Sequence, residues 1–380
     1  MKILHLLYES RGDLFGIGGV GIRAYEIYRR IQDRHDVTLL CKKYPGARDG
    51  KVEGLRHIFV GTESRSLTKT LLSYAYRASQ FVKRNGPEYD IIVEEFSPAI
   101  PTFYHLFIRK PVVLQVQGYT GRFYFRKYNF FYAVVLFLSE LLRARFYTNF
   151  IFINHEMMEK FYLKREKHSA VIPNGISSEL LDIPDDERDY VLYIGRIDVY
   201  GKGLDILLEA YGEFFRSSPG IRLVIAGDGR DRKRFQSMLM KLPEGIRKNI
   251  EMPGWISDER KGSVFSKAVF VVFPSRHEAQ PIAVLEAMGS GKAVLVSDLP
   301  EFRFVKDTGA GTEFKAGDAR SLVQAMKDLL IHGERKAMGQ RGREWVKDYT
   351  WDAIALQYEE FLYKIADQAV SMGTCRGEHG

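Results

Sequence analysis

Residues 274–289 decide the fold prediction, and they read PSRHEAQPIAVLEAMG. The six residues before them, 268–273 (AVFVVF), are continuously apolar, as expected of a strand buried on both faces of a parallel sheet. Pro274 ends that strand, Pro281 suits the first position of a helix, and Gly289 suits its end. The stretch therefore predicts a strand, a loop and a helix in succession, the repeating unit of an open α/β sheet.

Two glutamates in this stretch are candidate ligand-binding residues. Glu278 falls in the loop at the carboxyl end of the strand, where open α/β sheets bind ligands. Glu286 falls in the second turn of the predicted helix, so the two carboxylates can hold two hydroxyl-bearing parts of one ligand. The alternative is a pair of solvated carboxylates without a role, which is the usual state of surface glutamates.

A second motif, GRIDVYGKG at residues 195–203, follows an expected strand at 189–194 and precedes a helix. Arg196 and Lys202 flank this turn. A helix N-terminus favours anions, a guanidinium can bind phosphate through two parallel hydrogen bonds, and an ammonium acts as a point charge. The pattern predicts a diphosphate site, and the alternative is a pair of solvated loop cations.

Together these segments resemble the retaining glycosyltransferases of family 4, which have the GT-B fold. Residues 278–286 resemble that family's Glu-x7-Glu signature, and residues 195–203 resemble its Gly-Arg-x-x-x-x-Lys-Gly element with one extra residue before the lysine. The resemblance covers nearly the whole chain, most strongly residues 172–330, and implies an α/β architecture of two doubly wound Rossmann-like domains facing each other across a cleft. Four further segments fall in the family's order: 172–176 (IPNGI), 224–229 (VIAGDG), 253–256 (PGWI) and 293–298 (AVLVSD).

The resemblance also implies a role for each matching residue. Arg196 and Lys202 would neutralise the diphosphate leaving group, and Glu278 would hold sugar hydroxyls near C3 and C4; these are the expected catalytic residues. Glu286 would hold the ribose. The donor would be a nucleotide-diphosphate sugar, with no further cofactor and no metal, because the sequence has no Asp-x-Asp. The expected substrate-binding residues are Gly18, Gly19, Gln117, Trp255, Ile256, Ala279, Gln280, Ile282 and Glu286.

Gln117 is the main departure from the family pattern. Many members have a histidine here, facing the donor sugar near its reacting carbon. Glutamine can hydrogen-bond a hydroxyl but cannot titrate. This position therefore favours one alternative, a GT-B protein that binds a sugar nucleotide without transferring the sugar. Ala279 also replaces a more usual glycine, but an alanine leaves its backbone amide free.

A glycine-rich segment at residues 16–21 (GIGGVG) contains a GxGxxG pattern, which opens another alternative, an NADP-dependent oxidoreductase. The first glycine comes about eight residues after the expected first strand, later than in a dinucleotide-binding turn. The second strand carries no acid for an adenosine ribose, although Lys42 and Lys43 suit a 2′-phosphate. The resemblance instead implies that the amides of Gly18 and Gly19 lie near the donor phosphate.

Composition favours a two-domain cytoplasmic protein. The 380 residues are 45% hydrophobic, enough for two cores. Cys41 and Cys375 make no metal-binding or disulfide pattern, as expected of a reducing compartment. The first nine residues are too short and too soon acidic for a signal peptide. No apolar run reaches the roughly 18 residues of a membrane span.

Charge is unevenly distributed along the chain. Residues 1–175 hold 27 Lys and Arg against 16 Asp and Glu, whereas residues 176–380 hold 29 against 32. A basic half predicts an anionic partner. We expect a membrane surface, bound peripherally at its inner face, that carries a lipid-linked acceptor; a glycan is the other expected acceptor. The alternative is a generally basic surface without such a partner. Residues 123–132 (FYFRKYNFFY) are aromatic and basic, as in interfacial helices, or belong to a core helix. Nucleic acid is not expected, because no recognition helix or zinc finger is visible.

Strand and helix patterns alternate throughout. We expect a first domain of residues 1–172 completed by a helix at 351–370, a second domain of residues 173–350, a loop at 182–189, and a frayed tail from residue 371. Expected strands are 2–8, 36–41, 56–60, 90–94, 111–116, 148–154, 189–194, 221–226, 250–252, 268–273, 292–297 and 311–314. Expected helices are 20–33, 66–85, 128–146, 155–164, 203–217, 230–241, 258–266, 281–289, 300–306, 318–331 and 351–370.

Overall fold

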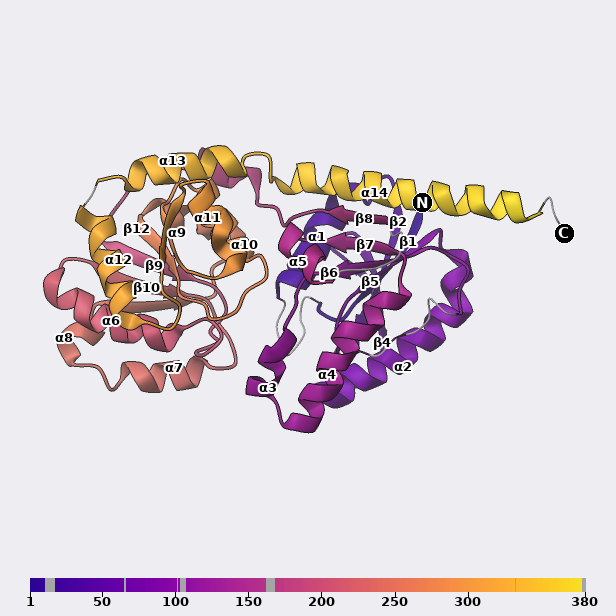
Figure 1. Ribbon diagram of the computed structural model, residues 1–380, viewed down its shortest axis with the longest axis horizontal. Helices are drawn as coiled ribbons and strands as arrows, with labels where there is room; N and C mark the ends of the chain where they lie inside the picture. The colour runs from indigo at the N-terminus through magenta and orange to yellow at the C-terminus, as the bar shows by residue number, and fades with distance from the viewer. Residues whose placement is uncertain are drawn as a thin grey trace. The chain divides into compact units, whose positions relative to one another are not determined.

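The protein is described here by a computed structural model, in which residues 1–10, 18–64, 66–100, 102, 107–161, 168–331 and 333–377 are placed (Figure 1). The chain divides into two compact units. Unit 1 comprises Met1–Asn174 and Trp351–Gly380, and unit 2 comprises Gly175–Thr350. Each unit is built on a parallel sheet with helices packed against it, so the predicted α/β class is confirmed.

Unit 1 contains an eight-stranded sheet in the order β3-β4-β2-β1-β5-β6-β7-β8. All neighbouring strands are parallel except β3 and β4, which form an antiparallel hairpin. The strands are β1 (Lys2–Leu7), β2 (Asp36–Lys42), β3 (Gly50–Val52), β4 (Leu55–Val60), β5 (Ile91–Glu95), β6 (Val112–Val116), β7 (Asn149–Phe152) and β8 (His168–Val171). The helices are α1 (Gly19–Ile31), α2 (Leu67–Asn85), α3 (Tyr124–Lys127), α4 (Phe130–Arg143), α5 (His155–Lys160) and α14 (Trp351–Gly377).

Helix α14, at the C-terminal end of the chain, packs against α1 (Figure 1). The carboxylate of Glu359 accepts hydrogen bonds from Arg34 at 2.8 and 2.9 Å and lies 2.6 Å from Nε2 of His35. Further along, the hydroxyls of Tyr28 and Tyr358 are 3.2 Å apart in a buried contact. These contacts explain why a helix more than 300 residues away in sequence belongs to unit 1.

Unit 2 contains a six-stranded, all-parallel sheet in the order β11-β10-β9-β12-β13-β14. Its strands are β9 (Tyr190–Ile194), β10 (Arg222–Ala226), β11 (Ile250–Gly254), β12 (Ala268–Phe273), β13 (Val294–Ser297) and β14 (Gly311–Phe314). Its helices are α6 (Leu204–Ser217), α7 (Arg232–Leu239), α8 (Glu244–Arg247), α9 (Asp258–Ser266), α10 (Ile282–Gly289), α11 (Arg303–Asp307), α12 (Ala319–Ile331) and α13 (Arg335–Val346).

The central strands of unit 2 are buried on both faces, as the apolar run at 268–273 predicted. Along β12, Phe270 and Val272 contribute to a core shared with α6 and α12. Val271 and Phe273 contribute to a second core shared with α10 and α11. The alternation follows from the two-residue period of a strand, and it places helices on both faces of the sheet (Figure 1).

Several expected elements differ from those observed. The helix expected at 128–146 begins at Phe130 as α4 and ends at Arg143, because Asn129 caps α4 with its side chain 3.0 Å from the amide of Tyr132; the short α3 precedes it as a separate helix. The expected helix at 155–164 ends at Lys160, and residues 162–167 lie outside the described part of the chain. The fraying expected from residue 371 is wrong as far as Gly377, because α14 continues to that residue. Strands β3 and β8 and helices α3, α8 and α13 were not predicted.

Candidate functional site

Two loops of unit 2 follow neighbouring strands. The strands β9 and β12 are adjacent, with β10 and β11 on one side of them and β13 and β14 on the other. This reversal of strand order is the topological switch point, outside which open α/β sheets bind their ligands. The β9 loop (residues 195–203) leads into α6, and the β12 loop (residues 274–281) leads into α10.

The two loops are packed tightly against each other. Gly203 has a φ of +64°, and a Cβ built there would lie 1.8 Å from the carbonyl oxygen of Pro274. The amide of Arg276 donates to the carbonyl of Gly201 at 3.0 Å. The guanidinium of Arg276 binds both carboxylate oxygens of Asp205 at 2.8 Å. The helix N-terminus and the glutamate-bearing loop are therefore held as one piece.

Lys202 and Glu278 form the central ion pair of this site. The Nζ of Lys202 lies 2.5 Å from Oε1 of Glu278, and the hydroxyl of Ser275 donates to the same oxygen at 2.7 Å. The side chain of Glu278 is 9% exposed and that of Lys202 is 24% exposed. A half-buried pair is screened less by salt than an exposed one. Among the residues that the structure describes, Oε2 of Glu278 has no hydrogen-bond partner, so it can accept a further hydrogen bond.

Glu286 is buried on α10 and is paired with a lysine of α9. The Nζ of Lys261 lies 2.6 Å from Oε1 of Glu286 and 3.0 Å from Asp258. Burial lowers the pKa of Lys261, but the carboxylates of Glu286 and Asp258 outweigh this and hold the pKa above its ordinary value. The lysine therefore stays charged and holds Oε1 of Glu286 in place.

Arg196 is the exposed cation of the β9 loop. Its backbone carbonyl accepts a hydrogen bond from the hydroxyl of Tyr193 at 2.8 Å, and burial raises the pKa of Tyr193, which keeps this hydroxyl protonated. Within the described ranges, no residue forms an ion pair or hydrogen bond with the guanidinium of Arg196. An anion can therefore bind Arg196 without displacing an internal partner.

The arrangement can bind an anion and several hydroxyls at once. Arg196 and Lys202 supply positive charge beside the N-terminus of α6, and the helix dipole adds to it. Within the described part of the chain, the second carboxylate oxygens of Glu278 and Glu286 have no hydrogen-bond partner and can accept from a ligand hydroxyl. A phosphorylated sugar or nucleotide meets both requirements.

The remaining predicted residues of unit 2 differ in accessibility. Trp255 is 59% exposed, so its ring is not core and can meet a ligand. Ile256 is buried in the core on the α10 face of the sheet, so its side chain does not meet a ligand. Ala279, Gln280 and Ile282 are half-buried at the end of the β12 loop and the start of α10.

In unit 1 the amide of Gly18 binds an internal carboxylate. Oε2 of Glu9 accepts hydrogen bonds from the amides of Gly18 at 2.9 Å and Gly21 at 3.0 Å. Gly19 is the first residue of α1 and is exposed. A phosphate bound at these amides has to displace Glu9. Gly16, the first glycine of the GxGxxG pattern, lies outside the described residues.

Gln117 is held by a glutamate that the sequence analysis did not single out. The Nε2 of Gln117 donates to both oxygens of Glu95, at 2.9 and 3.0 Å. Glu95 also accepts from Gln115 at 2.5 Å and lies 3.1 Å from Nε2 of His5. Strand register brings these residues together, because β1, β5 and β6 are neighbours. With its nitrogen occupied, Gln117 presents its carbonyl oxygen as an acceptor for a ligand hydroxyl.

Two functional candidates were therefore missed. A signal for Glu95 existed in the sequence, because an acid ends an otherwise apolar buried strand, IIVEE at residues 91–95. Lys261 gave no comparable signal, since its partner Glu286 lies 25 residues further along the chain.

The residues expected to read an NADP phosphate are not arranged for it. Lys42 is buried in β2, and Lys43 is paired with Glu63 at 3.3 Å. Neither lysine is therefore an exposed and unpaired cation at the end of β2. The oxidoreductase alternative is therefore not favoured.

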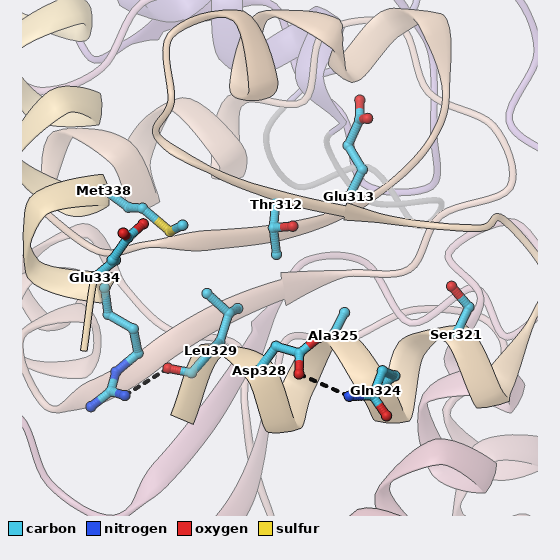
Figure 2. Close-up of a pocket in the computed structure, with 10 residues that line it drawn as sticks. Thr312, Glu313, Ser321, Gln324, Ala325, Asp328, Leu329, Glu334 and Met338 are labelled. Carbon is cyan, nitrogen blue, oxygen red and sulfur yellow. Dashed lines mark hydrogen bonds between the residues drawn. The ribbon is translucent and has the colours of Figure 1, made fainter. Parts of the chain in front are cut away.

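A cavity of about 560 Å³ in unit 2 lies away from the predicted site residues (Figure 2). It is bounded by Thr312 and Glu313 of β14, Asp328 of α12, and Glu334 and Met338 at the start of α13. None of the predicted site residues lines it. The candidate site is consequently placed at the switch point on its chemistry, not on the size of this cavity.

Two family models match the chain, one in each half. Residues 17–180 match the model described as Glycosyltransferase Family 4, and residues 182–345 match the one described as Glycosyl transferases group 1.

Individual proteins similar to this chain include a mannosyltransferase and a sucrose-phosphate synthase. The phosphatidyl-myo-inositol mannosyltransferase of Mycobacterium leprae is 31% identical over 195 residues, which cover 49% of this chain and 51% of that protein. The chain spans about half the length of the curated relatives it matches. Sucrose-phosphate synthase from Thermosynechococcus elongatus has a similar fold, with a TM-score of 0.77, 19% identity, and coverage of 96% of this chain and 99% of that one.

A further solved structure was determined with ligands. The Anabaena protein Alr3699/HepE, in complex with UDP and glucose, has a TM-score of 0.71 and 17% identity, with coverage of 96% of this chain and 99% of that one. At these identities the likeness shows the fold.

Proposed function

The chain is a family 4-like glycosyltransferase with the GT-B fold, and from this premise we propose that it moves a sugar from a nucleotide-diphosphate sugar to a hydroxyl, with retention of anomeric configuration. The observation that carries the proposal is the β9 loop, which presents Arg196 and Lys202 beside a helix N-terminus, next to Glu278. The Anabaena structure with UDP and glucose supports a nucleotide-sugar donor.

In the proposed mechanism the two cations stabilise the leaving group. As the sugar–phosphate bond breaks, negative charge develops on the diphosphate, and Arg196 and Lys202 neutralise it. Neither group has to gain or lose a proton, and no metal is required for this step. The acceptor attacks from the face that the diphosphate leaves, and the departing phosphate takes the acceptor's proton.

The two glutamates orient the donor. We assign Glu286 to the ribose hydroxyls and Glu278 to the sugar hydroxyls near C3 and C4. Lys261 and Lys202 hold the two carboxylates at fixed positions through their Oε1 atoms. Gln117 is assigned a hydrogen bond from a substrate hydroxyl, which its carbonyl oxygen accepts.

We further propose that the acceptor is a glycan or a lipid-linked molecule presented at an anionic membrane surface, visited from the cytoplasm. The excess positive charge of residues 1–175 supports this part. None of the helices in the described residues combines the length and apolar content of a membrane span. We propose that attachment is peripheral, through the basic surface of residues 1–175.

The proposal is tested by measuring release of free nucleotide from a panel of UDP-, GDP- and ADP-sugars, with and without acceptor extracts. Turnover of at least one donor, increased by an acceptor, is the expected result. Tight binding of a nucleoside diphosphate without turnover of any donor would instead support the alternative of a sugar-nucleotide-binding protein.

A further inference from the structure

Helices α2 and α4 of unit 1 lie side by side (Figure 1). Side chains of both helices line an apolar groove. The groove has a volume of about 430 Å³, within the roughly 300–1,000 Å³ that ligand pockets occupy. Its walls include Leu71 and Leu72 of α2, and Val135, Leu138 and Leu142 of α4. A groove of this lining suits a hydrocarbon chain better than a sugar or nucleotide.

Helix α4 is apolar on both its inner and its outer face. Ala133 and Leu136 face inward and pack with Tyr124. On the outer face Phe131 is 82% exposed and Val135 is 61% exposed. A helix that is apolar all round is normally buried, and large exposed apolar patches mark sites of interaction with proteins or membranes. The outer face of α4 therefore exposes to water apolar side chains of the kind that a protein or membrane partner covers.

The charges around this groove are of one sign. Helix α2 has the sequence LTKTLLSYAYRASQFVKRN, with four cations and no acid. Between residues 118 and 146 the sequence contains five Lys and Arg but a single acid, Glu140. That acid is buried under α4, where it accepts hydrogen bonds from the amides of Thr120 at 2.9 Å and Gly121 at 2.7 Å. Two exposed cations flank these helices and are called the rim cations: Lys69 on α2, next to the groove-lining Thr68, and Arg126 on α3, which packs against α4.

We propose that the groove between α2 and α4 binds one acyl chain of an anionic membrane lipid, while the rim cations bind the surrounding headgroups. Because lipid tails are as apolar as the leucines of the groove, burying one acyl chain there adds little affinity by itself. Clustered cations add a second, electrostatic contribution. Both features belong to α2 and to the packed pair α3 and α4, so together they account for peripheral attachment. This inference rests on the proposed function in one respect, namely that this bilayer presents the acceptor.

The first test uses the full-length protein and vesicles of phosphatidylglycerol or phosphatidylcholine. We expect co-sedimentation with phosphatidylglycerol at low salt and release at high salt. Lys69→Glu and Arg126→Glu should each weaken retention about fivefold or more, the equivalent of one cation lost near an anionic surface. Met240→Lys is the control for a changed charge at an exposed apolar position, because Met240 is exposed in unit 2. Equal retention by both vesicle types at all salt concentrations would overturn the electrostatic part.

The second test addresses the groove itself. The native tryptophans are Trp255, Trp345 and Trp351, so Leu142→Trp adds a reporter in the groove. Its added fluorescence should be quenched by vesicles that contain brominated acyl chains. Ser139→Phe should reduce that quenching, because Ser139 lines the groove and a larger side chain fills it. Unchanged quenching after filling, or no quenching at all, would overturn acyl-chain binding.

A third measurement separates this inference from the proposed function. Binding of UDP and GDP is measured for the same variants without vesicles. Unchanged nucleotide binding alongside lost vesicle binding supports the inference. If an acidic protein binds this surface and vesicles do not, the inference of a lipid partner is contradicted. Absence of nucleotide binding or turnover in the unaltered protein would defeat the proposed function and leave the vesicle results interpretable.

Discussion

Arg196 and Lys202 differ in their surroundings, although both are assigned to the diphosphate. Lys202 is paired with Glu278 at 2.5 Å, whereas Arg196 is exposed at the start of the β9 loop. A ligand phosphate therefore adds to an existing ion pair at Lys202 and supplies a first partner to Arg196. Neither residue belongs to a core, so each can be replaced without unfolding unit 2.

Replacing Arg196 or Lys202 with alanine should weaken nucleoside diphosphate binding by about 1.5–3 kcal/mol, because each removes a hydrogen bond to a charged group. Titration calorimetry with UDP and GDP measures the change. Arg216→Ala is the matched control, since Arg216 is exposed at the opposite end of α6, about 20 Å away for a helix of this length. Unaltered affinity in both site variants would refute the assignment.

The two glutamates should respond differently to neutral substitution. Glu286→Gln should weaken binding of free nucleoside diphosphate, because its assigned partner is the ribose. Glu278→Gln should leave that binding nearly unchanged and should lower the rate of transfer, because its assigned partner is the sugar. Comparing calorimetry with turnover separates the two effects. The reverse pattern, or equal loss of nucleotide binding, would contradict the division of roles.

At the level of elements, the junction between the β9 loop and α6 depends on a glycine. Gly203→Ala should destabilise the protein by roughly 2–5 kcal/mol, because alanine at positive φ is strained and its Cβ would meet the carbonyl of Pro274. Gly212→Ala is the control within the same helix: no atom lies within 4 Å of its Cβ, and alanine should stabilise by about 0.5–1 kcal/mol. Chemical denaturation followed by circular dichroism measures both. Equal stability of the two variants would count against the close approach.

Helix α14 provides a pH prediction at the same scale. The hydrogen bonds from Arg34 hold the pKa of Glu359 below its ordinary value against the effect of burial, and His35 contributes in the same direction. Because the pKa is lower in the folded state, this stabilisation is complete above the unfolded pKa of about 4.3 and is lost as the pH falls through the folded value.

The protection of the α14 amides against hydrogen exchange, taken relative to the intrinsic rate at each pH, should therefore fall in that acidic range. Glu359→Gln should accelerate exchange already at neutral pH and should reduce its pH dependence. Glu360→Gln, at the exposed neighbouring position, should leave exchange as it is. If the Glu359 and Glu360 variants behave alike, the contact does not hold α14.

Helix α13 shows why some elements could not be predicted from the sequence. Its sequence, RKAMGQRGREWV, is polar and contains two glycines, so it lacks the apolar stripe by which helices are recognised. In the structure the glycines are the contact face: a Cβ at Gly339 would lie 1.9 Å from the carbonyl oxygen of Gly291, and one at Gly342 would lie 3.1 Å from Ala310. Such close packing is a tertiary property that periodicity does not reveal.

At the scale of the molecule, sequence patterns predicted those strands and helices whose position depends on local burial. The run at 268–273 is the strand β12 with the expected bounds, and the expected strand at 311–314 is β14. The pairing of β9 with β12, and of β1 with β5, depends instead on contacts between distant segments. The partners Lys261 and Glu95 could not be assigned for the same reason, although Arg196, Lys202, Glu278 and Glu286 were named from their motifs.

The central claim is that the protein transfers a sugar from a nucleotide donor with retention. Proton NMR of a reaction with an α-linked donor identified by nucleotide release tests it most directly, because the coupling of the anomeric proton reports the configuration of the first product formed. The account predicts an α-linked product that appears together with free nucleoside diphosphate, at a rate reduced in Lys202→Ala. A β-linked first product would contradict retention, and an intact donor in the presence of all acceptors tested would contradict transfer.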